Sequence, residues 1–219
     1  MSTPDFEAAY RANTIVDGQE GMPWNIGEPQ PPLRALIDSG HIQGPVLDAG
    51  CGLAETALYC AARGFEAVGL DSSETAIKQA RASAYERGLS VGIEVADITD
   101  FTGYDGRFRT IFDSTLFHSL PVEGRDGYLR SIARAAAPGA QLHMLVFNTE
   151  AQFPEDAGVP NKVTENELSE AVTQHWTIDS LQHSVITASF APVEDDSVGR
   201  DARGRAQLPA FQLAAHLPE

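Results

Sequence analysis

The residues with the clearest chemical meaning are an aspartate and two glycines at the end of an apolar run. Asp48 lies in the run 46–49, and Gly50 and Gly52 follow it closely. A strand that ends in such a glycine turn and opens a helix lets the backbone approach a ligand closely. In a dinucleotide site the last position of the glycine pattern is Gly or Ala. Here it is Glu55, whose carboxylate would lie near two phosphates. The turn therefore predicts a ligand that carries positive charge.

Three later apolar runs end in an acid in the same way. Their acids are Asp71, Asp97 and Asp113. In a doubly wound sheet the carboxylate after the second strand holds ribose hydroxyls, and Asp71 has this position. Because the carboxyl ends of parallel strands meet at one edge, we expect the four acids to lie together there. Four acids at one edge favour a cationic cofactor over nucleotide phosphates.

Periodic segments supply the elements that would position these acids. Strands are expected at 46–49, 65–70, 91–96, 110–112 and 141–148, and as a final antiparallel pair at 176–190 and 207–216. Helices are expected at 33–39, at 54–62, through Ile77, Ala80 and Ala84 up to Gly88, and from a capping box at 164–167 through Val172. The segment 194–205 between the last strands is expected to be a solvated loop. This alternation of strands and helices predicts an α/β fold.

The chain resembles the class I S-adenosylmethionine-dependent methyltransferases from about residue 20 to residue 217. The matching segments are VLDAGCG (46–52), VGLDSS (68–73), VADITDF (95–101), TIFDSTLFHSL (110–120) and APGAQLHMLVF (137–147). Ala54 departs from the pattern, since many members carry a third glycine there. The resemblance implies one domain over 1–219 with a Rossmann-like, seven-stranded, mostly parallel sheet, an antiparallel last strand and helices on both faces. Residues 1–32 would form a lid over the cofactor cleft, and residues 33–219 would form the core.

The resemblance also implies which residues hold S-adenosylmethionine. They are Trp24, Gln30, Asp48, Gly50, Cys51, Gly52, Asp71, Ser72, Asp97, Ile98 and Asp113. The stretch 21–32 is similar to the P-W-(D/N)-I-G-x-P-Q-P segment of small-molecule methyltransferases, akin to the thiopurine and thiol or halide enzymes and to bacterial quinone or heterocycle methyltransferases. It would bring Trp24 and Ile26 near the methionine end of the cofactor, where an indole face beside a sulfonium contributes about 0.5–2 kcal/mol. Alternatively, Trp24 only fills the edge of the core.

The loop 113–121 is expected to line the place where methyl donor and acceptor meet. His118 could accept a proton from a phenol, a hydroxyl or a ring nitrogen, because histidine titrates near neutral pH. Asp113 is a second candidate for a catalytic role. The acceptor would be bordered by Trp24, Ile26, Phe117, His118 and Phe153. Alternatively, His118 is a buried structural residue that supports the site without touching the acceptor.

Composition limits the possible partners. The net charge of −16 opposes binding to DNA, RNA or an anionic membrane, because such sites need a basic surface. The six histidines form no H-x-x-x-H pair and no C-x-x-C occurs, so no metal is expected. There are two cysteines and 42% hydrophobic residues, with no signal-like or membrane-spanning run. These features predict a cytoplasmic protein without disulfides, either a monomer or a homodimer.

Together these features predict an enzyme that transfers a methyl group from S-adenosylmethionine directly to a small acceptor and releases S-adenosylhomocysteine. The acceptor is expected to be an aromatic or heterocyclic hydroxyl, nitrogen or thiol. A thiol or halide methyltransferase and a non-catalytic S-adenosylmethionine-binding protein are alternatives. A nicotinamide oxidoreductase is a third alternative, disfavoured by Glu55 and by Asp48.

Overall fold

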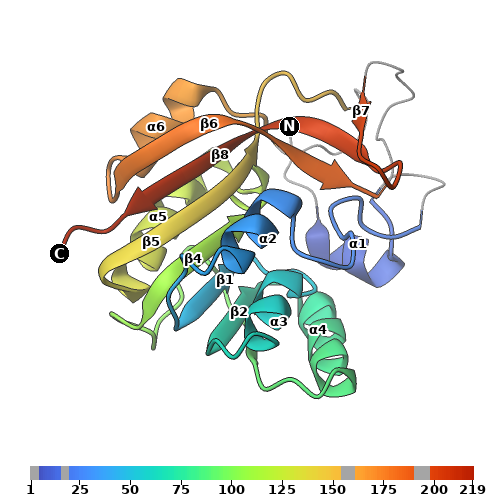
Figure 1. Ribbon diagram of the computed structural model, residues 1–219, viewed down its shortest axis with the longest axis horizontal. Helices are drawn as coiled ribbons and strands as arrows, with labels where there is room; N and C mark the ends of the chain where they lie inside the picture. Colours follow the sequence, from blue (N-terminus) through green and yellow to red (C-terminus); the bar gives the residue numbers. More distant parts are fainter. Residues whose placement is uncertain (1–4, 16–19, 154–160, 190–197) are drawn as a thin grey trace.

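A single mixed sheet runs through the molecule in the order β3-β2-β1-β4-β5-β8-β6, with the short β7 paired to β8 (Figure 1). The computed structural model describes residues 5–15, 20–153, 161–189 and 198–219. The strands are β1 (Val46–Ala49), β2 (Ala67–Asp71), β3 (Gly92–Val95), β4 (Phe108–Ser114), β5 (Ala136–Phe147), β6 (Thr177–Ala188), β7 (Gly199–Arg200) and β8 (Ala206–His216). The predicted Rossmann-like α/β class is confirmed, and the two-residue β7 is added to the seven expected strands.

The last strand lies inside the sheet. Strands β1 to β5 pair in parallel, whereas β8 is antiparallel both to β5 and to β6. His216 lies opposite Gln141 of β5 on one side and opposite Thr177 of β6 on the other. The predicted antiparallel last strand is therefore confirmed. The parallel strands bring their carboxyl ends to one edge, where ligands bind in open α/β sheets.

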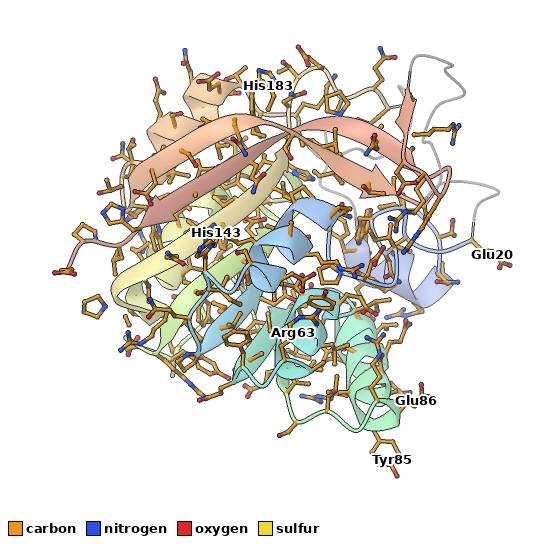
Figure 2. All side chains as sticks on the ribbon, viewed as in Figure 1. Glu20, Arg63, Tyr85, Glu86, His143 and His183 are labelled. Atoms are coloured by element: carbon orange, nitrogen blue, oxygen red, sulfur yellow. The ribbon has the colours of Figure 1, made fainter. Side chains whose placement is uncertain are left out.

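Helices cover both faces of the sheet, as predicted. One face carries α2 (Pro31–Asp38), α3 (Glu55–Ala61) and α4 (Glu74–Glu86), and the other carries α5 (Arg125–Ala135) and α6 (Glu165–Val172). Strand residues alternate between the two cores: Val46 packs with the first group of helices and Leu47 with the second. In α4 the predicted apolar positions are buried, while Tyr85 and Glu86 point into solvent (Figure 2).

Two helices were not predicted, namely α5 and α1 (Phe6–Ala12). Helix α1 is capped by Asp5, whose side chain accepts a hydrogen bond from the Ala8 N–H. The predicted capping box of α6 is confirmed, because the Thr164 and Glu167 side chains each accept from the other's backbone N–H. Both cysteines are free, as expected. Among the residues that the structure describes, no helix is long and apolar enough to cross a membrane.

The described part of the segment between β6 and β8 contains a short strand and ion pairs that were not predicted. Residues 190–197 lie outside the described residues, but 198–205 contain β7 and a tight turn. Arg205 is only 16% exposed, and it donates to Asp201 and to Glu28. Arg203 donates to the same Glu28 carboxylate. Most residues of 198–205 are exposed, as predicted for a solvated loop, but Arg203 and Arg205 also form ion pairs with the N-terminal segment that were not predicted.

Candidate active site

The turn between β1 and α3 is built from backbone that only small residues adopt easily. Gly50, Gly52 and Ala54 all have positive φ angles, of 63°, 52° and 60°. A Cβ atom at Gly50 would lie 2.6 Å from a methyl group of Leu116, and one at Gly52 would meet the Tyr10 hydroxyl. Ala54 takes the left-handed conformation that glycine favours, which explains why a third glycine is common at this position.

Two cavities of about 360 Å³ and about 60 Å³ lie at the carboxyl edge of the sheet. Tyr10, Trp24, Gly50 and Thr115 line both of them. The larger cavity is lined by Asp5, Phe6, Glu7, Tyr10, Trp24, Gly50, Asp71, Ser72, Asp97, Ile98, Thr115, Leu116, His118, Ser119, Leu120, Pro121 and Phe147. Its volume falls in the range of small-molecule sites.

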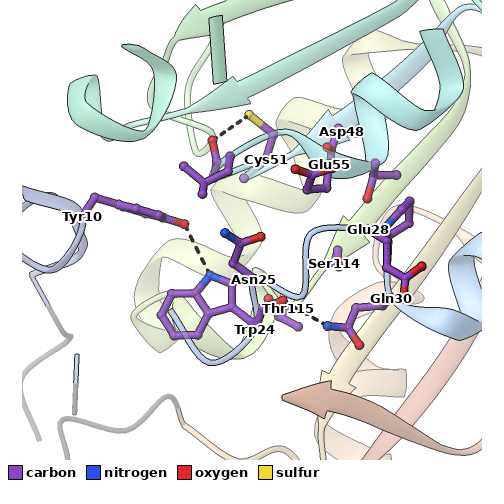
Figure 3. Close-up of a pocket in the computed structure, with 15 residues that line it drawn as sticks. Tyr10, Trp24, Asn25, Glu28, Gln30, Asp48, Cys51, Glu55, Ser114 and Thr115 are labelled. Atoms are coloured by element: carbon purple, nitrogen blue, oxygen red, sulfur yellow. Dashed lines mark hydrogen bonds between the residues drawn. The ribbon is translucent and has the colours of Figure 1, made fainter. Parts of the chain in front are cut away.

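Tyr10 and Trp24 form the wall between the two cavities. The indole Nε1–H donates to the Tyr10 hydroxyl at 3.4 Å, and Phe6 meets the indole edge to face with ring centroids 5.9 Å apart. Figure 3 shows this pair reaching across the cleft from α1 and from the segment before α2. Burial raises the pKa of Tyr10, so its hydroxyl stays protonated. Tyr10 is not among the predicted site residues, because only the tertiary fold brings α1 against Trp24.

Two of the four predicted acids, Asp71 and Asp97, face the larger cavity. Asp71 accepts from the N–H groups of Gly52 and Ser73, both at 2.8 Å, so it also fixes the glycine turn. Burial raises its pKa, and these backbone donors oppose the rise. Asp97 accepts from the Thr99 N–H and hydroxyl. With Ser72 and Ile98 on the same wall, these residues could hold a nucleoside as predicted.

The other two acids have different surroundings. Asp48 is 2% exposed, borders the small cavity and accepts from the Ala57 N–H; burial raises its pKa to about 8. Asp113 is fully buried and borders neither cavity. Its carboxylate accepts from the N–H groups of Leu116 and Phe117 and from the Tyr128 hydroxyl, and burial raises its pKa to about 6. Asp113 thus holds the loop after β4 instead of facing a ligand.

Glu55 has a partner that no sequence pattern indicates. Arg87 at the end of α4 binds its carboxylate with two hydrogen bonds, of 2.7 and 2.9 Å. The charge that was expected to repel phosphates is therefore partly neutralised. The lining of the larger cavity is stronger electrostatic evidence for a cationic ligand. Among the described residues, the larger cavity has four acidic side chains and no lysine or arginine, a set that suits a cationic ligand: Asp5, Glu7, Asp71 and Asp97.

The loop after β4 brings His118 into the larger cavity. Thr115 has a φ of 77°, which is unusual for a β-branched residue and stores strain next to the site. The 3-10 helix η1 (Phe117–Ser119) follows, and His118 is 1% exposed within it. Its Nδ1 accepts from the Phe147 N–H at 3.1 Å, and the two rings lie 4.6 Å apart. Burial lowers the pKa of His118 to about 3, and the charge of Arg125 adds to this shift.

Several predicted contact residues lie behind the cavity walls. Phe117 is buried in the core under the guanidinium of Arg125, which lies 4.7 Å from the ring centroid. Phe153 packs edge to face on Phe147 at 5.0 Å, so it supports a wall residue. Ile26 borders neither cavity. The structure therefore brings only Trp24 and His118 of the five predicted acceptor contacts to the cavity surface.

Gln30 and Cys51 border the small cavity, but their polar groups have protein partners. The Gln30 amide donates to the carbonyls of Trp24 and Thr187 and accepts from the Thr187 N–H, which joins the segment before α2 to β6. The Cys51 thiol donates to the Gly52 carbonyl. Glu28, also at this cavity, accepts from Arg34 as well as from Arg203 and Arg205.

The residues present fit S-adenosylmethionine. The acidic lining suits its sulfonium and amino group, Gly50 leaves space where a side chain would block the turn, and Asp71 and Asp97 offer carboxylates for ribose and base. Helix α1 and the segment before α2 also line the cavities, the latter through Trp24, Asn25, Glu28, Pro29 and Gln30.

Comparison with known proteins agrees with this geometry. A methyltransferase domain family matches residues 46–139. A 2-heptyl-1-hydroxyquinolin-4(1H)-one methyltransferase of Mycobacteroides abscessus is 51% identical over an alignment of 218 residues that covers 96% of each chain. "Probable thiol methyltransferase 2" of Arabidopsis thaliana is 25% identical over 153 residues, which are 68% of this chain and 66% of the relative.

Solved structures share the whole fold. A structure reported for the conversion of a disulfide bond into a thioacetal group during echinomycin biosynthesis has a TM-score of 0.82 and 32% identity, and the match covers 99% of this chain and 91% of that chain. A methyltransferase from Anabaena variabilis has a TM-score of 0.70 at 17% identity, over 99% of this chain and 98% of that chain, which shows the fold alone. From the glycine turn, the strand order and these relatives, we conclude that the chain belongs to the class I S-adenosylmethionine-dependent methyltransferases.

Proposed function

We propose that the enzyme methylates an oxygen of a small, flat heterocycle of the hydroxyquinolone kind. The observation that carries this proposal is the two-part lining of the larger cavity. Its cofactor side holds Asp71 and Asp97, whereas the far wall is apolar apart from His118 and Ser119. The apolar residues of that wall are Leu116, Leu120, Pro121 and Phe147. The relative from Mycobacteroides abscessus, named for a 1-hydroxyquinolin-4(1H)-one, supports the same acceptor class.

In this proposal each part of the site has one task. Asp71, Ser72, Asp97 and Ile98 hold the nucleoside, and the amino-acid end of the cofactor lies in the small cavity beside Asp48. Trp24 stands between the two parts. S-adenosylmethionine supplies an electrophilic methyl group. The chain contributes alignment of the acceptor and exclusion of water, which together provide several kcal/mol in such reactions.

A thiol acceptor is the second candidate. Both the Arabidopsis relative and the structure from echinomycin biosynthesis concern sulfur chemistry by their names. An aromatic thiol of the same ring size would enter the same cavity. The two candidates differ in the atom that is methylated, and the test below therefore compares them on one ring system.

The first experiment is calorimetric titration of S-adenosylmethionine, S-adenosylhomocysteine and NAD into the protein. We expect micromolar affinity for the two sulfur compounds and none for NAD, with a loss of at least about tenfold in Asp71→Ala. Glu86→Ala, which removes an exposed acid at the end of α4 that lines neither cavity, is the matched control. Binding of NAD alone would contradict the proposal.

The second experiment offers 1-hydroxyquinolin-4(1H)-one and a quinoline thiol at equal concentrations and identifies the methylated product by mass spectrometry. A higher kcat/KM for the hydroxyl compound supports the oxygen acceptor. A higher value for the thiol would favour the second candidate. Cofactor binding without transfer to either compound would favour a non-catalytic binding protein.

A further inference from the structure

Among the described residues, only one of the two ring nitrogens of His118 has a hydrogen-bond partner, which leaves the other, Nε2, free to serve a ligand in the larger cavity. Its Nδ1 accepts a hydrogen bond from the Phe147 N–H at 3.1 Å. A ring nitrogen that accepts carries no proton, so the neutral imidazole has its hydrogen on Nε2. The ring is 1% exposed and borders the cavity, with one edge anchored on β5. In this tautomer the Nε2–H group of His118 can act on a ligand in the cavity as a hydrogen-bond donor and not as a base.

The surroundings keep the ring neutral. Burial disfavours protonation of the ring, and the charge of Arg125 of α5 adds to this effect. Asp113 of β4 lies beneath the same loop, but its carboxylate is bonded to Leu116, Phe117 and Tyr128. Among the described residues no carboxylate bonds to the ring, so His118 lacks the acidic partner that orients a catalytic base.

The acids of the cavity belong to other elements. Asp5 faces it from the N-cap of α1, Glu7 and Tyr10 from α1 itself, Asp71 from the end of β2 and Asp97 from the loop after β3. No hydrogen bond joins any of these five side chains to His118 in the part of the chain that the structure describes. These groups can bind a cation, whereas the wall formed by the loop after β4 offers a hydrogen-bond donor.

The positive charge behind this wall is incompletely paired. Arg125 is 8% exposed, and its Nε and Nη2 atoms have no hydrogen-bond partner among the described residues. Its guanidinium stacks over Phe117, the residue before His118, with Cζ 4.7 Å from the ring centroid. A buried cation of this kind lowers the energy of an anion nearby, because the local dielectric screens it weakly.

We propose that His118 donates a hydrogen bond from Nε2 to an oxygen of an acceptor that binds as an anion, and that the enzyme therefore selects acidic hydroxy-heterocycles and phenols. This inference rests on the proposed function and names its substrate class. The anionic oxygen forms a bond to the methyl carbon while the carbon–sulfur bond breaks and its electron pair stays on sulfur. The charges of anion and sulfonium cancel, and no proton has to pass to the protein.

Two substitutions at His118 test the hydrogen-bond donor Nε2 separately from the acceptor Nδ1. In His118→Asn the side-chain oxygen can replace Nδ1 as the acceptor for Phe147, but no group reaches the place of Nε2. In His118→Gln the amide nitrogen reaches that place instead. We expect His118→Asn to lower kcat/KM for the acceptor roughly 10–100-fold, as for loss of a hydrogen bond to a charged group. We expect His118→Gln to lose much less, and both variants to bind S-adenosylhomocysteine like the wild type.

The deciding measurement is the pH profile of kcat/KM for acceptors of different acidity: 1-hydroxyquinolin-4(1H)-one, a nitrophenol and unsubstituted phenol. We expect the inflection to move with the acidity of each acceptor and to persist in His118→Asn. An inflection at one pH for all three, abolished in His118→Asn, would identify His118 as a base and overturn the proposal. Absence of transfer to every acceptor in the wild type would instead refute the proposed function, and this inference with it.

Two readouts do not depend on turnover. Nitrogen-15 NMR of histidine-labelled protein should show a protonated Nε2 and a bare Nδ1 for His118, without titration across the neutral range. The absorbance spectrum of 1-hydroxyquinolin-4(1H)-one bound to the S-adenosylhomocysteine complex should be that of its anion at a pH where the free compound is partly protonated. A titrating His118 or a neutral bound acceptor would contradict the proposal.

Discussion

Asp48, Asp71, Asp97 and Asp113 end or follow four neighbouring strands, yet the fold gives them different tasks. Asp71 and Asp97 face the larger cavity, Asp48 borders the small one, and Asp113 is bonded inside the protein. The sequence predicts their common edge, because strand order follows from the alternation of elements. It does not predict their protonation, which depends on burial and on the backbone donors that the turns supply.

The first prediction concerns Asp48, whose pKa burial raises to about 8. A cationic ligand favours the ionised carboxylate, so affinity for S-adenosylmethionine should rise as pH rises. Between about pH 6.5 and pH 8 the rise attributable to Asp48 should reach about tenfold. Calorimetry on the wild type and on Asp48→Asn tests this, because titration of the cofactor's own amino group is common to both. Equal pH dependence in the two proteins would refute it.

The second prediction concerns His143 in β5, which is 8% exposed and packs against Phe112 (Figure 2). Burial lowers its pKa to about 4. Between about pH 4 and about pH 6.5, His143 is protonated in the unfolded chain but neutral in the folded protein. The stability that neutral His143 contributes is therefore present above about pH 6.5 and is lost as pH falls through this window.

We expect His143→Phe to gain about 1 kcal/mol in the free energy of unfolding relative to the wild type when pH falls from about 7.5 to about 5.5. Urea unfolding at the two pH values measures this difference. His183→Phe, which replaces an exposed histidine on β6, is the control and should show no such change. A constant difference between His143→Phe and the wild type would refute the prediction.

At the scale of elements, α1 packs on Ala76 of α4 and is tied to the N-terminus of α4 by one carboxylate. Glu7 accepts from the Ser73 hydroxyl at 2.6 Å and from the Thr75 hydroxyl at 2.7 Å and its N–H at 3.1 Å. These hydrogen bonds lower the pKa of Glu7 to about 2, so it stays ionised at neutral pH. Helix α1 supplies Tyr10 to both cavities and Phe6 to the larger one.

The third prediction follows from this contact. Glu7→Ala should release α1 from α4 and weaken binding of S-adenosylhomocysteine by roughly tenfold, because the Tyr10–Trp24 wall is then no longer fixed. Calorimetry gives the affinity. Glu74→Ala removes an acid from the same helix terminus without touching α1 and should bind like the wild type. If the two variants bind alike, α1 does not contribute to the site.

Prediction from sequence succeeded where a signal is local and failed where it is tertiary. The glycine turn, the capping box of Thr164 and the alternating strands depend on neighbours in the chain. Helix α1 has only seven residues, and Tyr10 gains its role from Trp24 across the cleft. The pairing of Glu28 with Arg205 likewise joins residues from opposite ends of the chain, and no periodic pattern signals such a contact.

At the scale of the whole molecule, the site combines α1, the segment before α2, the ends of the parallel strands and the loop after β4. A ligand that binds only the folded protein stabilises all of it by mass action. At a free ligand concentration of about 100 times the dissociation constant, the free energy of unfolding rises by about 2.7 kcal/mol. We therefore expect S-adenosylhomocysteine to raise Tm by about 5–10 °C for a chain of this length.

Thermal unfolding with increasing ligand checks this fourth prediction. NAD at the same concentrations should leave Tm unchanged, and Asp71→Ala should need higher concentrations of S-adenosylhomocysteine for the same shift. A shift with NAD and none with S-adenosylhomocysteine would contradict the assignment of the cavity to the methyl donor.

The place of β8 between β5 and β6 has a consequence for synthesis. When the ribosome has made β6, the strand that will separate it from β5 does not yet exist, so β6 has no partner in the sheet. The half of the molecule that carries β1 to β5 can assemble early, whereas the far edge must wait for residues 206–216. Until then two strand edges stay open to other chains. A nascent chain that stalls before β8 is therefore the species most exposed to aggregation and to proteolysis.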